Sequence, residues 1–333
     1  MPQLGRYPFS LGSNMKNARR GMLRGMGTDP QPLPDGAEEF EEHRSRVFSV
    51  AYRMLGSAAE AQDVVQDAYL RWAGAHRSDI AVPGAWLTRV AVNLCLNRLS
   101  SARVQRERYV GPWLPEPVAT GTAAPAPLGP LETVEQRETV SLALLSLMER
   151  LTPVERAVFV LRDAFGYGHR EAAEVVGITE AASRQAHRRA RVRLAEGQPR
   201  FEPSVQRWRE VVEVFLDAAQ GGDIDRLHAV LADDVVSYSD GGGKVTAARR
   251  PITGRTRVAH FLGRLAGMAT AEHTVVIAEI NGVPALVVLL GGVPVSVLAP
   301  EVADGRVATL RIVANPDKLA FLTRQPGTDW HPV

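Results

Sequence analysis

The chain has 333 residues, of which 45% are hydrophobic and 23% charged, so it is long enough for two or three folded domains. Its net charge of +2 excludes a uniformly basic surface, and any nucleic-acid contact must come from a local patch. A single cysteine, Cys95, excludes an internal disulfide framework and fits a reducing cytoplasm. No apolar run approaches the roughly 18 residues of a membrane-spanning helix, so no membrane partner is expected.

Residues 1–36 are rich in Gly, Pro, Arg and Met and contain no continuous apolar core. They therefore lack the apolar stretch that defines a signal peptide. Met15, Met22 and Met26 are each candidates for the translation start. We expect this segment to be a disordered basic tail or a start assigned too far upstream.

Apolar residues recur at helical spacing over residues 37–108 and predict an all-α domain, with helices at 38–54, 58–73 and 85 to about 108. Cys95 is expected in its core. The other side chains predicted to point inward are Phe40, Val47, Val50, Ala51, Met54, Ala61, Val64, Val65, Ala68, Trp72, Leu87, Val90, Ala91, Leu94 and Leu99.

The outer face of the second helix carries Asp63 and Asp67 one turn apart, with Gln66 and Arg71 beside them. Like charges at this spacing destabilise an isolated helix by about 0.2–0.5 kcal/mol. A basic partner surface would relieve that repulsion. A solvated acidic face is the alternative explanation.

The third helix carries a polar face formed by Arg89, Asn93 and Asn97, and arginines including Arg103 crowd its C-terminal end. Amides and arginines on one face are suited to the backbone and splayed bases of a single strand. These residues are equally typical of a solvent-facing helix, where the helix dipole favours cations at the C-terminal end.

Residues 109–135 are rich in Pro, Gly and Ala and predict an extended linker without a core of its own. Within it, the segment 113–117, WLPEP, is too apolar to remain free in solvent. We expect Trp113 and Pro115 to dock on a groove. Simple anchoring of the linker is the alternative role.

Residues 136–196 predict a second all-α domain that ends in a helix-turn-helix. Gly177 is placed to end the first helix of this unit in a left-handed conformation, and Thr179 is placed to cap the second. The packing side is predicted to contain Ala172, Ala173, Val176, Ala182, Ala186, Ala190 and Leu194.

The opposite side of the second helix carries arginine and glutamine, which pair bidentately with guanine and adenine edges. Further arginines hold phosphates. A solvated basic helix fits the same pattern, because a helix-turn-helix pattern alone is a weak motif. The predicted DNA-facing residues are Arg184, Gln185, Arg188 and Arg191.

Residues 205–325 change from helical to alternating periodicity and predict an α+β domain with a curved antiparallel sheet. Helices are expected at 204–220, 223–232 and 257–268. Strands are expected at 235–240, 244–254, 273–282, 284–290, 294–302 and 306–315.

The chain contains no HExxH, GxSxG or Walker sequence and no cluster of metal-ligand residues. The titratable candidates of the C-terminal domain show no catalytic spacing, so we expect no enzyme activity, cofactor or metal. Glycines 241–243 permit a tight turn with positive φ, for which a hairpin is the simplest explanation. The candidates are Asp240, Lys244, His228, His260 and His273.

The order of these segments resembles the extracytoplasmic-function sigma factors of bacterial RNA polymerase, in which two helical domains read the two promoter elements. Residues 58–75, AAEAQDVVQDAYLRWAGA, resemble the part that clamps the polymerase core. Residues 85–99, AWLTRVAVNLCLNRL, resemble the part that recognises the upstream edge of the promoter bubble and helps to melt it. Residues 151–194 resemble the domain that reads the distal promoter element.

This resemblance implies two partners, RNA polymerase core and promoter DNA, and a cytoplasmic location. By it, Asp63, Gln66, Asp67 and Arg71 contact the core. The polar face of the third helix and the recognition helix contact DNA.

The C-terminal domain resembles the cone-shaped SnoaL-like domains of the nuclear-transport-factor superfamily, which enclose a pocket where a small ligand can bind. The phrases WLPEP at 113–117, DGGGK at 240–244 and NPDKL at 315–319 are typical of a sigma-factor subgroup with such a fused domain. They imply a built-in regulator in place of a separate anti-sigma protein, although Asn315, Asp317 and Lys318 could instead cap the last strand. The residues given a regulatory role are Trp113, Pro115, Asp240, Gly241, Gly242, Gly243, Lys244, Asn315, Pro316, Asp317 and Lys318.

The alternative function is a one-component transcription regulator, in which a ligand sensor is fused to a helix-turn-helix without a polymerase partner. Residues 58–99 argue against it, because a simple repressor has no need of a second polar helical surface. A bifunctional enzyme with a ligand in the cone cavity is a further alternative.

Overall fold

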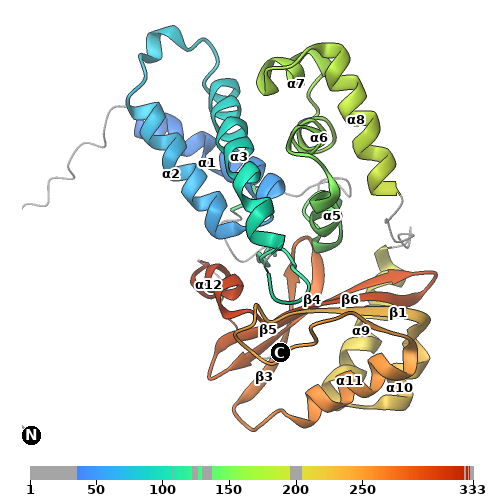
Figure 1. Cartoon of the computed structure of the whole chain (residues 1–333). Coiled ribbons are helices and arrows are strands. Elements are labelled where there is room, and N and C mark those ends of the chain that lie inside the picture. The colour runs from blue at the N-terminus through green and yellow to red at the C-terminus, as the bar shows by residue number, and fades with distance from the viewer. Residues whose placement is uncertain are drawn as a thin grey trace, which may run out of the picture.

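The computed structural model describes residues 36–107, 109–121, 127–129, 137–195, 205–325, 328 and 330, without the side chains of 101–107, 205–209 and 220. The expectations for residues 1–35, for the Arg103 side chain and for most of the linker after residue 121 lie outside the described residues. Two groups of helices lie above one face of a six-stranded sheet, and three further helices cover its other face (Figure 1). No helix in the described ranges is long and apolar enough to cross a bilayer.

The first group of helices comprises α1 (Ala37–Leu55), α2 (Ala58–Ala73) and α3 (Pro83–Glu107), followed in Figure 1 by the linker. Gly56, with φ 67°, ends α1, and the Ser57 side chain accepts a hydrogen bond from the Glu60 amide to cap α2. A short 3-10 turn, η1 (Arg77–Asp79), precedes α3. Every side chain predicted to point inward is buried, so the apolar stripes of these three helices are confirmed.

The second group comprises α5 (Leu142–Leu147), η2 (Met148–Arg150), α6 (Pro153–Phe159), its π-helical extension η3 (Val160–Ala164), α7 (His169–Val176) and α8 (Glu180–Ala195). Gly177, with φ 78°, ends α7, and the Thr179 hydroxyl accepts from the Ala182 amide at 3.2 Å, as predicted. The predicted packing stripe is buried at Ala172, Ala173, Ala186, Ala190 and Leu194, and Val176 is half-buried against the core. Ala182 is only half-buried, and Ser183 and Val175, which the prediction did not include, are buried.

The two groups of helices share one hydrophobic core. Tyr52 and Leu55 of α1 belong to the same cluster as Leu145 of α5 and Leu161 of the α6 extension. Arg156 of α6 reaches across and donates to the Met54 carbonyl at 2.8 Å. The two groups are therefore packed against each other rather than held apart by the linker.

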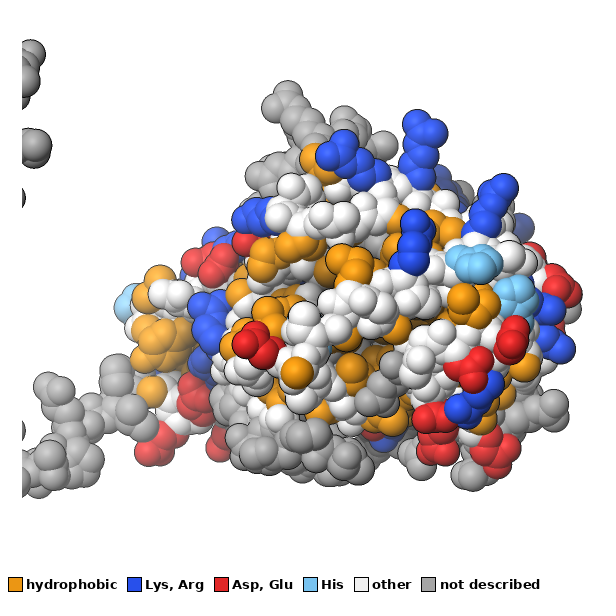
Figure 2. Space-filling view, turned by 90° about the horizontal axis from the view of Figure 1, so that it is seen from below, with side chains coloured by type: hydrophobic (Ala, Val, Ile, Leu, Met, Phe, Trp, Pro, Cys, Tyr) orange, Lys and Arg blue, Asp and Glu red, His pale blue; other side chains and the backbone are white. Residues whose placement is uncertain are grey.

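The C-terminal domain places α9 (Val205–Gly221), α10 (Ile224–Val230) and α11 (Arg255–Gly267) on one face of the sheet (Figure 1). Seen from below, the molecule carries apolar side chains and uncharged atoms at its centre, with charged side chains mostly around them (Figure 2). The strands are β1 (Leu231–Asp240), β2 (Ile252–Thr253), β3 (His273–Ile280), β4 (Val283–Leu290), β5 (Val293–Ala303) and β6 (Arg306–Val313). Their order in the sheet is β2-β1-β6-β5-β4-β3.

The expectation of an antiparallel sheet is wrong at one pair, because β1 and β6 run parallel. Tight turns join β3 to β6 into a meander, and such turns force neighbouring strands to alternate in direction. No turn joins β1 to β6. The chain between them contains α11 and the first strands of the meander, so their relative direction is free of that constraint.

The expected strand at 244–254 is also wrong, since only Ile252 and Thr253 pair with β1. Glycines before this segment have positive φ, and Pro251 lacks the amide that a ladder needs, so residues 241–251 form a loop. The sequence analysis also did not predict α12 (Pro316–Arg324), which packs on the same face of the sheet as the two groups of helices (Figure 1). Asn315 caps this helix, and Pro316 occupies its first turn.

Candidate DNA-binding, polymerase-binding and interdomain surfaces

The exposed side of α8 carries the predicted DNA-facing residues. Arg184, Gln185, Arg188 and Arg191 are all exposed, while Ser183, Ala186, Ala190 and Leu194 on the opposite side are buried. Arg184 forms an ion pair with Glu180 one turn earlier on the same helix. The geometry thus leaves a row of arginine and glutamine side chains open to a nucleic acid.

Two further arginines of α8 have a structural role that the sequence did not reveal. Arg189 donates to the buried Glu155 carboxylate at 2.8 Å, and Arg193 contacts the same group. Glu155 also completes the capping box of α6 with Thr152. Burial opposes ionisation of Glu155, but the hydrogen bonds from Arg189 and Thr152 outweigh it and hold its pKa below the usual range. Arg189 and Arg193 therefore fasten α8 to α6.

The acidic stripe of α2 is matched within the chain. Arg98 of α3 lies 2.8 Å from the Asp67 carboxylate and 3.4 Å from that of Asp63. This cation relieves the repulsion between the two carboxylates, which the sequence analysis expected a basic partner surface to relieve. Both carboxylates remain accessible beside the exposed Gln66 and Arg71. The apolar side chain of Leu70, which the sequence analysis did not single out, lies next to them and is 62% exposed.

The polar stripe of α3 is exposed over Arg89, Asn93 and Asn97. Each of these side chains lies opposite the buried stripe that contains Leu87, Ala91 and Leu94. The three side chains follow one another at one-turn intervals, as a strand-binding face requires. The structure therefore brings these predicted residues together on one surface.

The linker segment WLPEP docks on the corner between α1 and α2. The Glu116 carboxylate accepts hydrogen bonds from the Ser57 hydroxyl at 2.7 Å and from the Ala58 and Ala59 amides at 2.9 and 3.0 Å. The Tyr52 hydroxyl donates to the Glu116 carbonyl at 2.5 Å. Burial raises the pKa of the Glu116 carboxyl, although these hydrogen bonds oppose the rise. The linker thus supplies a cap for the first turn of α2.

The same segment is held from the other side by an ion pair of the C-terminal domain. Asp240, at the end of β1, is fully buried and lies 2.7 Å from the Nζ atom of Lys318 in α12. Asp240 also accepts from the Leu114 amide at 2.8 Å and from the Tyr109 hydroxyl at 2.6 Å. Lys318 donates to the Leu114 carbonyl, and its Nζ atom lies 4.1 Å from the centre of the Trp113 ring. The phrases WLPEP, DGGGK and NPDKL therefore meet in one contact.

The glycines after Asp240 allow this contact to form. A side chain at Gly241 would place its Cβ 2.7 Å from that of Ala247, and one at Gly242 would lie 2.2 Å from the Asn315 amide nitrogen. Gly242 also has φ 59°. The turn is not a hairpin between paired strands, because residues 244–251 form a loop. At its end, Lys244 forms an exposed ion pair with Asp317 at 2.5 Å.

A second interdomain contact, which the sequence reading missed, is made by Asn281 in the turn between β3 and β4. Asn281 is fully buried and has φ 55°. Its amide group donates to the Tyr52 hydroxyl at 2.6 Å and to the Val140 carbonyl at 2.7 Å, and its carbonyl oxygen accepts from the Val118 amide at 3.0 Å. One side chain therefore joins α1, the linker and the segment before α5. The only sequence signal was the Asn-Gly pair, which is typical of hairpin turns.

The linker continues along the edge of the sheet next to this turn. Ala119 forms an antiparallel bridge with Ile280, and the Thr120 amide donates to the Glu279 carbonyl at 2.9 Å. The Gln325 side chain exchanges two hydrogen bonds with the Ala119 backbone, at 3.0 and 2.7 Å. The linker thus covers part of an edge strand that would otherwise be open.

The titratable residues of the C-terminal domain are not gathered in one place. Asp240 and Lys244 contact the linker and α12, as described above. His260 is exposed on α11, His228 is half-buried on α10, and His273 lies at the start of β3 beside Thr270. Apolar side chains such as Phe215, Leu298 and Leu310 pack together between the helices and the sheet.

Comparison with known proteins assigns a separate family model to each of the two groups of helices. Residues 40–104 match the family model for sigma-70 region 2, and residues 141–194 match that for sigma-70 region 4. The chain is 39% identical to the ECF RNA polymerase sigma factor SigJ of Mycobacterium tuberculosis, over 84% of this chain and 92% of that protein. It is 30% identical to the probable ECF RNA polymerase sigma factor SigI of Mycobacterium tuberculosis, over 86% and 96% respectively.

Among solved structures, the crystal structure of the Mycobacterium tuberculosis extracytoplasmic function sigma factor SigJ aligns with a TM-score of 0.67 and 36% identity, covering 87% of this chain and 99% of that one. That alignment spans the helical groups as well as the α+β domain. The helical modules, their order, the fused domain and these similarities lead to one conclusion: the chain belongs to the extracytoplasmic-function family of RNA polymerase sigma factors.

Proposed function

We propose that the fused domain holds this sigma factor in a closed state that RNA polymerase core must open. The observation that carries this proposal is the Asn281 contact, because one buried side chain ties α1 to both the linker and the start of the second helical group. Two modules packed on one core cannot be moved apart to reach two separate promoter elements. Opening therefore precedes promoter reading.

The polymerase-binding surface of this proposal is the outer face of α2, with Asp63, Gln66, Asp67 and Arg71. The exposed Leu70 lies among these charges and adds an apolar anchor of the kind found in protein interfaces. On binding, Asp63 and Asp67 would exchange their contact with Arg98 for contacts with basic groups of the core. The Pro-rich linker at 109–135 is the part that moves between the modules at 37–108 and 136–196 and the domain at 205–325.

The DNA-binding surfaces are the exposed sides of α8 and α3. Arg184, Gln185, Arg188 and Arg191 read the distal element, and Arg89, Asn93 and Asn97, with Arg103 further along α3, hold the opened strand. This work takes place where the polymerase acts, in the cytoplasm. It requires no catalysis by the sigma factor itself, and the fused regulator takes the place of a separate anti-sigma protein.

Reconstituted transcription tests the proposal. A chain that ends at residue 203 should bind core more tightly than the full chain and should start transcription at lower concentration. Equal binding by the two chains would contradict the closed state. Failure of both to bind core would contradict the polymerase-binding surface as well.

The recognition face of α8 gives a separate prediction. Arg188→Ala should weaken binding to the promoter in the assembled holoenzyme about tenfold or more, since a bidentate contact to a base contributes about 1–3 kcal/mol. If Arg188 holds a phosphate instead, the slope of log affinity against log salt should fall by about 0.9. Promoter-binding titrations over a range of salt measure both quantities.

The matched control is Arg170→Ala on α7. Arg170, like Arg188, is an exposed helical arginine, but it lies outside the recognition helix and pairs with Glu174 on α7. Its removal should leave promoter affinity within about twofold. Equal losses for both variants would argue against a specific role for α8.

The acidic stripe gives a further prediction. Asp67→Ala should weaken core binding about fivefold to tenfold, because it removes the less exposed of the two carboxylates that would meet a basic partner. Glu42→Ala, an exposed acidic residue on α1, is the control. Core affinity can be measured by fluorescence titration at two salt concentrations. An unchanged affinity for Asp67→Ala would place the core-binding surface elsewhere.

A further inference from the structure

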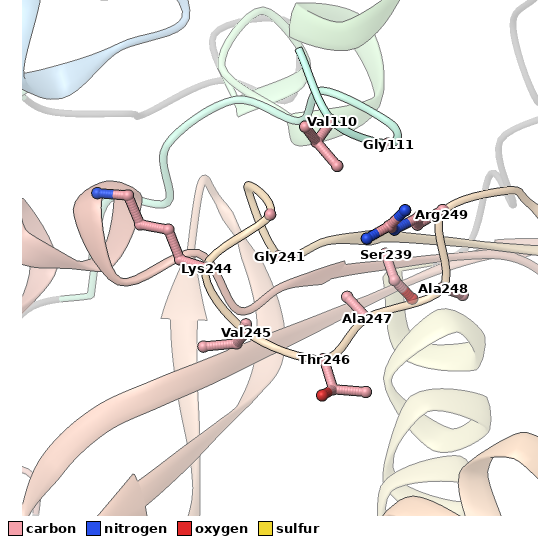
Figure 3. A pocket seen from close by; sticks show the side chains of 11 residues that line it. Val110, Gly111, Ser239, Gly241, Lys244, Val245, Thr246, Ala247, Ala248 and Arg249 are labelled. Atoms are coloured by element: carbon pink, nitrogen blue, oxygen red, sulfur yellow. The ribbon is translucent and has the colours of Figure 1, made fainter.

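A cavity of about 340 Å³ lies between the linker and the loop that follows β1 (Figure 3). The linker provides one wall with Val110 and Gly111, and the loop provides the other with residues 243–249. Ser239, at the end of β1, also lines it. None of its lining residues belongs to the apolar core between the helices and the sheet.

Two polar groups of this cavity lack partners among the described residues. Ser239 is 3% exposed, and its hydroxyl has no hydrogen-bond partner. The Arg249 side chain is exposed, its guanidinium makes no hydrogen bond or ion pair with the described residues, and in Figure 3 it points across the space toward Gly241. Lys244, by contrast, points away and pairs with Asp317. A buried hydroxyl without a partner is unfavourable, so a ligand that accepts its hydrogen bond would be stabilised there.

The chemistry of the walls defines the class of ligand. A guanidinium presents parallel donors that match a carboxylate or phosphate, and the serine hydroxyl is a further donor. The remaining lining includes the apolar side chains of Val110, Val245 and Ala248. A cavity of roughly 150 Å³ accepts benzene, so this one has room for a body of one ring with its anionic group.

We propose that this cavity binds a compact organic anion, with one carboxylate or phosphate on Arg249 and Ser239 and an apolar body against Val110. Because the linker and the loop form opposite walls, the complete site exists only while the linker is docked. A ligand that contacts both walls binds the closed state more tightly and must therefore stabilise it. This second step rests on the closed state proposed above; the binding site itself does not.

Titration calorimetry with the full chain tests the site. The probes are benzoate, phenyl phosphate and the neutral benzamide, which has nearly the same shape as benzoate. Benzoate or phenyl phosphate should bind saturably, and benzamide at least tenfold more weakly. Comparison of the two anions shows which group the site prefers.

Protein variants locate the binding. Arg249→Gln should weaken binding of the preferred anion at least tenfold, whereas Arg250→Gln, which changes an exposed neighbour that does not line the cavity, should leave it within twofold. Ser239→Ala should weaken binding without lowering the melting temperature, because its hydroxyl has no partner to lose. Absence of saturable anion binding, or equal binding by the Arg249→Gln variant, would overturn the site.

The coupling is tested by core binding in the presence of the anion. At a concentration ten times its Kd, the apparent affinity for core should fall by up to roughly elevenfold. An anion that binds but leaves core affinity unchanged would overturn the coupling. If Asn281→Ala also leaves core affinity unchanged, the proposed closed state is wrong. Anion binding measured by calorimetry tests the binding site independently of that result.

Discussion

Asn281→Ala should raise the affinity of the full chain for polymerase core by up to about a hundredfold. The substitution removes buried hydrogen bonds to Tyr52, Val140 and Val118. The Val140 carbonyl and the Val118 amide lose the bond that Asn281 supplies, whereas the Tyr52 hydroxyl keeps its bond to the Glu116 carbonyl. Each buried group left unpaired costs about 1–3 kcal/mol, so a total on the order of 3 kcal/mol is expected against the closed state. In the proposed mechanism only the open state binds core, so its larger population should appear directly as tighter binding.

Asp304→Ala provides a matched control. Asp304 occupies the turn between β5 and β6, has φ 51° and is followed by glycine, as Asn281 is, but it is exposed and contacts neither helical group. Alanine at either position carries the same backbone strain, roughly 1–2 kcal/mol. Core binding by fluorescence titration should therefore change for Asn281→Ala alone. If the two variants behave alike, the effect comes from a destabilised sheet and not from release of the helices.

Lys318→Met should also open the molecule, with a tenfold to hundredfold gain in core affinity and faster amide exchange in the linker. The substitution leaves the fully buried Asp240 carboxylate without its cation, and breaking a buried pair in this way costs about 3–5 kcal/mol. Part of this loss falls on the C-terminal domain itself, because both residues belong to it. The part that affects docking is reported by hydrogen exchange at the Leu114 amide, which donates to Asp240.

Two further variants separate the buried pair from general charge effects. Lys244→Met removes an exposed ion pair of the same loop, and exposed pairs contribute about 0–1 kcal/mol, so linker exchange should change little. Combining Asp240→Asn with Lys318→Met removes both buried charges and should recover part of the stability lost by Lys318→Met alone. Protection of the Leu114 amide that survives Lys318→Met would show that the linker docks without this pair.

Local sequence patterns were sufficient to predict the buried residues wherever a helix has one clear apolar face. The stripes of α1, α2 and α3 were predicted residue by residue, since a helix repeats every 3.6 residues and its buried face is visible in any window of a few turns. The turn of the helix-turn-helix was predicted for the same reason, from Gly177 and Thr179. The error at Ala182 and Ser183 arose because a stripe of small side chains leaves the rotation of α8 poorly defined.

Other predictions failed where the partner is distant in the chain. Asp240 is separated from Lys318 by 78 positions, and Asn281 from Tyr52 by 229, so no local pattern pairs them. The sequence also could not distinguish Arg188, which is exposed, from Arg189, which is held by Glu155.

The sequence by itself determined the helical modules, their order, the basic face of α8 and the three phrases that mark the interdomain contact. The modules and the basic face follow from short-range periodicity and from residue types with strong local preferences, whereas the three phrases were identified by their resemblance to a sigma-factor subgroup. The tertiary structure alone decided that both helical groups share one core, that Glu116 caps α2, that β1 runs parallel to β6 and that Asn281 joins the parts. Such features depend on burial between segments far apart in the chain. Where water is excluded, a polar group that loses its hydrogen bond or ion pair lowers the stability of the fold.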